Sequence, residues 1–379
     1  MALTKIQTAG ITDDAIDSDH YVDASIDNAH LADDAIDADK LASNSVVSAS
    51  IVDGAIVNAD INASAAIAAS KIAGIPVANR NVMINGQFDV WQRGTSFVYG
   101  SMTAHNYYMD RFRHEGAAWS GSVTQQTFTN GQTDVPGNPT YYARWIVSTV
   151  NAGGVSFIQR LENYPLNRHS GKTYTVSVWL KSVSGTIADG DVTIYGGAGT
   201  LGAITTTWQK FTKTTTVGTQ GGAYGPNWGL TVPTTVVMVN GLDIANFQVE
   251  EGSVATDFEQ KSFAETLAEC QRYYQIKGMG LIGGVESTSS TVGTMRTGIT
   301  YNPEMRAAPT VTVGSSTITY NYPGVAAIAS ISNAISWNSN PTSKGTVLGV
   351  GNYDNSGRAG GDLVVLSAGG NQFYFDAEL

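Results

Sequence analysis

The side chains best suited to chemistry in this sequence are aromatic rings that lie among small and polar residues. Trp119 occurs in AAWSGS, and Tyr224 and Trp228 occur in GAYGPNWG, where Gly, Ser, Pro and Asn predict exposed loops. An exposed ring can stack on the C–H face of a pyranose, and such stacking needs no charge. We therefore expect these three residues to form a platform for a sugar. The alternative is that the rings fill the end of a hydrophobic core.

Two further groups of residues are candidates for ligand contact. In the strand expected at 173–183, Trp179 and Lys181 fall on the face opposite to an apolar row, so they could line the outer surface of a sheet. The polar segment 352–360 (NYDNSGRAG) predicts either a receptor-binding loop or an ordinary hairpin turn. Its candidate residues are Tyr353, Asp354 and Arg358.

Catalytic motifs are absent from the sequence. It contains no Gly-x-Ser-x-Gly elbow, no His-Glu-x-x-His pair, no phosphate-binding loop and no dinucleotide fingerprint. Glycoside hydrolysis needs two carboxylates that face one sugar, and sequence alone does not place such a pair. Cys270 lies on the expected buried face of a helix, which favours a packing role over a nucleophilic one. We expect a protein that is not an enzyme and needs no cofactor.

Charge and composition exclude several classes of protein. The 379 residues include 32 Asp and Glu against 21 Lys and Arg, and no basic stripe is present, so nucleic-acid binding is not expected. A single Cys excludes an intrachain disulfide. The sequence has no apolar run of about 18 residues and no signal-peptide pattern, so we expect a soluble protein without membrane insertion.

A five-residue repeat occupies the N-terminal segment, where apolar residues recur from Ile11 to Ile61 between Asp, Asn, Ser and Gly. A period of five defines no face on a helix and alternates between the two faces of a strand. Several copies wound around an axis, or a single-chain solenoid, would bury the apolar row; the alternative is a disordered acidic linker. His20 and His30 lie one decapeptide apart and are either metal ligands at such an axis or solvated residues.

Downstream of the repeat the sequence favours an all-β fold. Short alternating runs rich in β-branched and aromatic residues predict a β-sandwich, with strands at 142–150, 173–183, 192–195, 208–217 and 234–239. A helix is expected at 263–276, with a stripe of Phe263, Leu267, Cys270 and Tyr274. Further strands are expected at 310–313, 317–320, 345–350, 363–366 and 373–375, and 278–284 is either a linker or a strand. The expected parts are a stalk at 1–78, a sandwich at 79–262, a connecting helix at 263–276 and a β-sandwich tip at 277–379.

Three segments carry a resemblance to a known family. They are 81–97 (NVMINGQFDVWQRGTSF), 157–183 (FIQRLENYPLNRHSGKTYTVSVWLKSV) and 247–274 (FQVEEGSVATDFEQKSFAETLAECQRYY). These segments resemble blocks of tailed-phage tail fibre proteins that carry a jelly-roll domain similar to carbohydrate-binding modules. The MALTKI start with its acidic pentads is similar to their stalks, and MRAAPT (305–310) is similar to part of their C-terminal β domain.

The resemblance implies a homotrimeric fibre of the bacteriophage virion, a structural protein of host attachment. Its N-terminus would bind a tail or baseplate protein, and its β domains would bind a glycan receptor on the host surface. The similar modules often hold a structural calcium, for which Asp89 and Asp257 would supply oxygen ligands. A head or neck fibre and a polysaccharide-depolymerising tailspike are the alternatives. The host, the receptor, the anchoring protein and the β domain that binds the receptor are left open.

Overall fold

The computed structural model describes most of the chain after residue 79. The described residues are 80–102, 107–116, 119–150, 153–163, 167–195, 200–219, 224–233, 236–287, 292–313, 317–321, 329–332, 335–337, 342–354 and 363–378, with Asp19, Tyr21, Val22, Ser25, Ile51, Val52, Ile56 and Asp60. The chain divides into two units, Met1–Ala68 and Ala69–Leu379. Nearly all of the repeat, with His20 and His30, lies outside the described residues.

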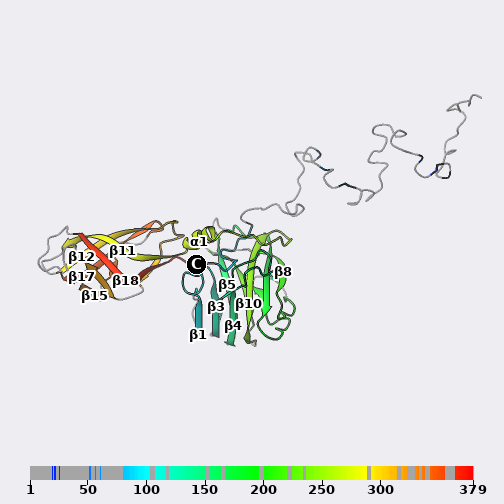
Figure 1. Cartoon of the computed structure of the whole chain (residues 1–379), viewed down its shortest axis with the longest axis horizontal. Helices are drawn as coiled ribbons and strands as arrows, with labels where there is room; N and C mark the ends of the chain where they lie inside the picture. The colour runs from blue at the N-terminus through cyan, green and yellow to red at the C-terminus, as the bar shows by residue number, and fades with distance from the viewer. Residues whose placement is uncertain are drawn as a thin grey trace, which may run out of the picture. The chain divides into compact units, whose positions relative to one another are not determined.

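Two antiparallel sheets make up the part of the second unit that precedes the helix (Figure 1). The strands described there are β1 Ser96–Met102, β2 Arg113–Gly116, β3 Trp119–Thr127, β4 Tyr141–Val150, β5 Val155–Glu162, β6 Thr173–Ser182, β7 Thr193–Tyr195, β8 Gln209–Thr216, β9 Tyr224–Val232 and β10 Met238–Glu251. One sheet has the order β1-β3-β4-β10-β6-β8, and the other has the order β2-β5-β9-β7.

The two sheets pack face to face because strands such as β4 and β6 place every second, apolar side chain on the face toward the other sheet. In β6, Tyr174, Val176, Val178 and Leu180 are buried in the shared core. Trp145 of β4 meets a ring of the opposite sheet, with 5.7 Å between its centroid and that of Phe157. The sandwich predicted for this region is therefore present.

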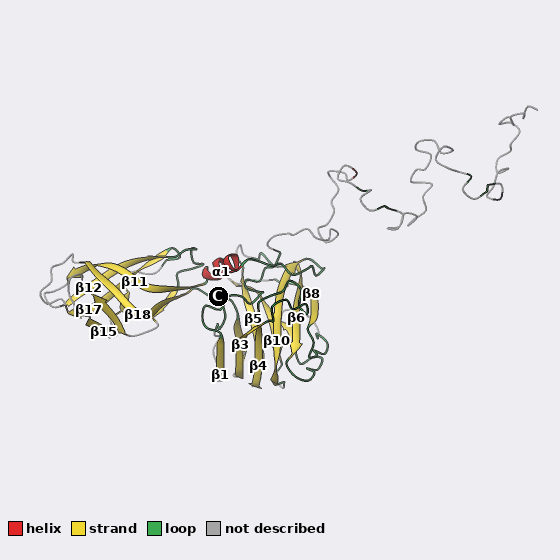
Figure 2. Cartoon of the chain, in the orientation of Figure 1, coloured by secondary structure: helices red, strands yellow, loops and turns green. Residues whose placement is uncertain are grey.

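The helix α1 (Phe263–Gln271) is shorter than predicted (Figure 2). Ser262 and Glu265 form a capping box that starts it, and only Thr266 and Cys270 on it are buried. The predicted stripe was wrong at Phe263, which is 56% exposed, and at Tyr274, where strand pairing has already replaced the helix. No helix in the described part of the chain is long and apolar enough to cross a membrane.

The strands after α1 belong to one eight-stranded antiparallel sheet, with the order β15-β14-β18-β11-β12-β17-β16 and β13 paired to β18. They are β11 Tyr274–Ser287, β12 Val292–Thr300, β13 Thr310–Val313, β14 Thr317–Asn321, β15 Ala329–Ser332, β16 Ile335–Trp337, β17 Gly345–Asp354 and β18 Leu363–Asp376. Whether this sheet folds into the sandwich predicted for 277–379 stays a prediction. The segment 278–284 is strand, and the two strands expected at 363–366 and 373–375 are one, because β11 pairs along both. The prediction of an all-β protein with one short helix is confirmed.

Two buried charges fasten the end of the chain to the sandwich. Arg111 and Glu378, both almost fully buried, form an ion pair, and the Arg111 guanidinium also lies 3.5 Å from the centroid of the Tyr273 ring. The amide of Ala377 donates to the carbonyl of Tyr273 at 2.8 Å. A buried ion is tolerated only when it is paired, so the last residues hold this arrangement in place.

His114 occupies an aromatic part of the sandwich core. Its ring centroid lies 3.8 Å from that of Trp119, 4.4 Å from that of Tyr108 and 5.6 Å from that of Trp145. Neither ring nitrogen has a hydrogen-bond partner among the described residues. Burial therefore lowers the pKa of His114 well below its ordinary value, and the folded protein holds it neutral.

We expect His114→Phe to reduce the loss of stability on acidification. Below about pH 6.5 the unfolded chain takes up a proton at this position, whereas the folded chain does not. The free energy of unfolding therefore falls by about 1.4 kcal/mol for each pH unit below that value. Between about pH 7.5 and about pH 5.5, the free energy of unfolding in urea should fall by about 1.4 kcal/mol less in the variant. Equal pH slopes for the two proteins would contradict a neutral His114. The variant leaves the other buried titratable groups His169, Asp110 and Asp89 unchanged. Their contributions to the pH dependence of stability are therefore the same in both proteins and cancel in the comparison.

Candidate functional site

A buried carboxylate organises the outer face of the six-stranded sheet. Asp243 of β10 is paired in register with Arg144 of β4 on one side and Lys181 of β6 on the other. Its oxygens accept from Arg144 Nε at 2.7 Å and Nη2 at 3.0 Å, and Lys181 Nζ lies 3.4 Å away. Asp243 is fully buried, whereas the side chains of Arg144 and Lys181 are 27% and 25% exposed. The three charges sum to +1, and the two positive ones reach the surface.

Three aromatic rings border these charges. The Tyr142 and Trp208 centroids are 5.4 Å apart with nearly perpendicular planes, and Phe128 lies 4.6 Å from Tyr142 and 5.3 Å from Trp208. Lys181 Nζ lies 5.0 Å from the Trp208 centroid and 5.8 Å from that of Tyr142, within cation–π range. All three rings are partly exposed. We call these three rings with Arg144, Lys181 and Asp243 the outer-face cluster.

Two members of the outer-face cluster, Arg144 and Tyr142, have pKa values above their ordinary ones. The hydrogen bond to Asp243 raises the pKa of Arg144 despite some burial. Burial, with the nearby Asp243 charge, raises the pKa of Tyr142, so this phenol stays neutral. The surface therefore offers a fixed pattern of cationic donors, a neutral hydroxyl and apolar rings.

Trp179 and Lys181 lie on the outer face of β6, as the alternation in the sequence predicted. Val178 and Leu180 point into the core, and Trp179 and Lys181 are partly exposed on the other side. Trp179 is paired in register with Lys210, whose Nζ donates to the carbonyl of Thr256 at 3.1 Å. Whether either residue contacts a ligand stays a prediction.

The expectation that loops expose Trp119 and Trp228 is wrong. Trp119 begins β3 and is 3% exposed, packed against His114 and against Tyr99 at 5.7 Å between centroids. Trp228 lies inside β9, is fully buried, and packs on Tyr174 at 5.7 Å. Neither ring face is available to a ligand in the folded sandwich.

The segment around Trp228 is a strand rather than a loop, and a glycine in it permits close strand pairing. Gly229 approaches β5 so closely that a Cβ at this position would collide with the carbonyl of Phe157. Tyr224, the third member of the predicted platform, begins β9, and its side chain is outside the described residues.

The candidates near the C-terminus are only partly within the described chain. Residues 352–354 form the end of β17, where Tyr353 pairs with Gly293 and Asp354 with Val292, so a loop begins no earlier than residue 355. The side chains of Tyr353 and Asp354 and the whole of Arg358 lie outside the described residues. Their role in receptor contact stays a prediction.

The structure describes Asp89 and Asp257, for which the resemblance implied a role as calcium ligands, and that role stays untested. Asp89 accepts from Gln87 Nε2 at 2.9 Å, and burial raises its pKa to about 6. The side chains of Arg80 and Gln248 donate to the backbone carbonyl of Asp257, at 3.1 Å and 3.3 Å. No group of three or more His, Cys, Asp or Glu side chains that could hold an ion occurs among the described residues. Cys270 is buried, which raises the pKa of its thiol well above the ordinary value.

Sequence analysis missed most of the outer-face cluster. Alternation within 142–150 does place Tyr142 and Arg144 on one face, but it does not reveal which strands lie beside β4. Asp243 and Trp208 join them only because β10 lies between β4 and β6 and because β8 follows β6 in the sheet. Strand order of this kind has no signal in a single sequence.

The fold and this face define an antiparallel β-sandwich protein with a charged and aromatic outer surface. It is similar to a CBM4 carbohydrate-binding module, with 17% identity over 44% of this chain and 98% of the module and a TM-score of 0.26. It is similar to the CBM22-2 xylan-binding domain from a Paenibacillus barcinonensis protein, with 12% identity, 41% and 99% coverage and a TM-score of 0.26.

The Stig cyclase FisC from Fischerella sp. TAU is also similar, with 12% identity over 42% of this chain and 100% of the cyclase and a TM-score of 0.25. No model of a known protein family matches the sequence, and no curated protein matches it. At these scores, the structural similarity assigns neither a ligand nor an activity to this chain.

We expect Asp243→Asn to lower the free energy of unfolding by about 2–4 kcal/mol, because it leaves two cations without their shared buried carboxylate. Glu251→Gln is the matched control on the same strand, since Lys172 and Glu251 form an exposed pair at 2.7 Å. Such a pair contributes less than about 1 kcal/mol. Urea denaturation of both variants measures the difference, and equal losses would show that Asp243 does not organise this face.

Proposed function

We propose that this protein is a non-enzymatic glycan-binding adhesin whose sandwich binds the glycan at the outer-face cluster. The observation that carries the proposal is the grouping of partly exposed rings around two cationic side chains on an open sheet face. Rings stack on the apolar faces of sugars, and a few polar groups fix their orientation. The cluster supplies both kinds of contact within one surface.

Donors for sugar oxygens come from Lys181 and Arg144. Besides Asp243, Lys181 Nζ has no hydrogen-bond partner among the described residues, so its ammonium keeps donors for a ligand. Asp243 holds Arg144 through two nitrogens and fixes the guanidinium plane. Because the cluster carries a net charge of +1 in a chain of net charge −11, it favours glycans that carry carboxylates.

We further propose that the protein is a homotrimeric bacteriophage tail fibre that mediates adhesion to the host cell surface. The sequence resemblance supports this role, and so does the repeat. Among its apolar positions, Tyr21, Ile51 and Ile56 are described and are 50%, 42% and 58% exposed in the single chain. Further copies wound around an axis would cover them, and the segment before residue 75 would attach the fibre to a tail or baseplate protein. Three copies of a weak glycan site gain avidity.

We expect the full-length protein to bind acidic host polysaccharide fragments more tightly than neutral fragments of equal length. Trp208→Ala should weaken binding of both by about tenfold, since it removes a stacking surface. Lys181→Met should weaken binding of the acidic fragments alone and reduce the dependence of their affinity on salt. Isothermal titration calorimetry measures these affinities.

Lys172→Met is the matched control, because this lysine is exposed and lies away from the cluster. Unchanged affinity in Trp208→Ala and Lys181→Met would place the glycan elsewhere. Reducing sugar should not be released during the incubation, and its release would overturn the non-enzymatic assignment in favour of a depolymerising tailspike.

We expect deletion of residues 1–74 to abolish trimer formation while the sandwich stays folded. The unit Ala69–Leu379 contains the hydrophobic cores, so far-ultraviolet circular dichroism should retain its β signal. Multi-angle light scattering should give a trimer for the full chain and a monomer for the deletion variant. A monomeric full-length protein, or normal incorporation of the deletion variant into virions, would refute the role given to this segment.

A further inference from the structure

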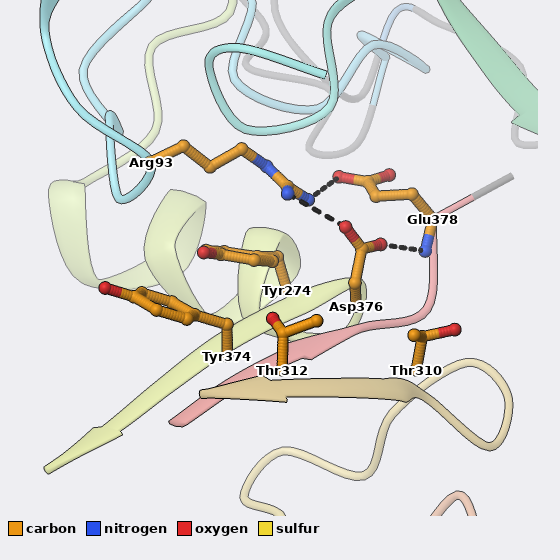
Figure 3. A pocket seen from close by; sticks show the side chains of 7 residues that line it. All are labelled: Arg93, Tyr274, Thr310, Thr312, Tyr374, Asp376 and Glu378. Atoms are coloured by element: carbon orange, nitrogen blue, oxygen red, sulfur yellow. Dashed lines mark hydrogen bonds and ion pairs between the residues drawn. The ribbon is translucent and has the colours of Figure 1, made fainter. Parts of the chain in front are cut away.

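A hollow lies away from the outer-face cluster, where a loop of the sandwich meets the strands that follow α1 (Figure 3). Its volume is about 560 Å³. The residues that line it are Arg93, Tyr274, Thr310, Thr312, Tyr374, Asp376 and Glu378. We call this hollow the strand-end pocket.

The floor of the strand-end pocket is one face of three adjacent strands. Asp376 of β18 is paired in register with Tyr274 of β11 on one side and with Thr310 of β13 on the other, and Tyr374 is paired with Thr312. Residues directly opposite one another share a face, so these side chains point the same way (Figure 3). Phe373 and Phe375 alternate to the other face and are buried, which fixes the direction of Tyr374 and Asp376.

Arg93 forms a wall of the pocket. Its guanidinium lies 3.6 Å from the centroid of the Tyr274 ring, 2.9 Å from Asp376 Oδ2 and 3.4 Å from Glu378 Oε1. Burial opposes its charge, but Asp376 and Glu378 keep the pKa of Arg93 above its ordinary value. Asp376 is also oriented by the amide of Glu378, which donates to its Oδ1 at 3.0 Å. Both charged groups are therefore held in place before any ligand arrives.

The remaining groups are an accessible ring and two hydroxyls. Tyr374 lies nearly parallel to Tyr274, at 14° and 6.4 Å between centroids, but the guanidinium covers Tyr274 and leaves Tyr374 as the partly exposed ring. The Thr310 and Thr312 side chains are exposed on the neighbouring strand. An aromatic face beside a fixed carboxylate and hydroxyls matches the apolar and polar faces of a pyranose.

We propose that the strand-end pocket is a second saccharide site, in which a neutral pyranose stacks on Tyr374 and its hydroxyls bond to Asp376, Arg93 and Thr312. The charges around the pocket cancel, since Arg93 and the buried Arg111 balance Asp376 and Glu378. A ligand with a net charge gains no attraction there. The site is independent of the outer-face cluster and prefers the opposite class of sugar.

Saturation-transfer-difference NMR on the full-length protein tests this proposal. The neutral probes are the methyl glycosides of glucose, galactose, mannose and N-acetylglucosamine, and methyl glucuronide is the acidic probe. We expect saturation transfer to at least one neutral probe and a weaker signal for the acidic one. Tyr374→Ala should weaken neutral binding by about tenfold, and Thr312→Val, which keeps shape and removes a hydroxyl, by about threefold or more.

Two controls make the outcome specific. Thr300→Val makes the same substitution on an exposed residue of β12 outside the pocket, and Trp208→Ala removes the ring on which a neutral sugar would stack in the outer-face cluster. Both should leave the neutral binding that depends on Tyr374 unchanged, whereas its loss in Trp208→Ala would assign the neutral sugar to the outer-face cluster and overturn the proposal. Absence of transfer to every neutral probe, equal transfer to the acidic probe, or unchanged binding in Thr312→Val and Tyr374→Ala would also overturn it.

Discussion

The ion pair between Arg111 and Glu378 is the constraint on which the arrangement after residue 80 depends. Both side chains are almost fully removed from water, and neither tolerates the loss of the other. Arg111 lies between β1 and β2 of the sandwich, while Glu378 is the second residue after β18. Pairing them brings the end of the chain back to the sandwich and places Tyr273 under the guanidinium. The ion pair therefore holds Arg93, the wall of the strand-end pocket, next to the strands that form the floor of the pocket.

The two proposed surfaces use charged residues in different ways. In the outer-face cluster, the buried Asp243 holds two cations that reach solvent, so the charge pattern at the surface is positive. In the strand-end pocket, carboxylates and guanidinium groups neutralise one another, and recognition is left to a ring and hydroxyl groups. The charged residues of the outer-face cluster and the floor of the strand-end pocket lie on strands, which keeps these side chains in fixed positions.

Sequence reasoning succeeded where information is local and failed where it depends on strand neighbours. The alternation in 173–183 correctly placed Trp179 and Lys181 outside and Val178 and Leu180 inside. Around Trp228, Gly and Pro indicated a loop, but Gly229 is there because β5 passes too close for a side chain. The grouping of Tyr142, Trp208 and Asp243 requires the order of four strands, and the grouping of Arg93 with Asp376 joins residues 283 positions apart. Neither the strand order nor a contact between such distant positions produces a periodic pattern in the sequence.

The strand β8 lies at the edge of the six-stranded sheet, with one row of backbone groups unpaired within the described sheet. Such an edge is a template for pairing with a strand of another molecule and hence for aggregation. Its sequence QKFTKTTT places Lys210 on one face and Lys213 on the other. A lysine on each face makes fusion with a neighbouring edge unfavourable by charge repulsion and by the cost of burying an ammonium. Sandwiches crowded together at high local concentration can therefore stay separate domains instead of merging into a continuous sheet.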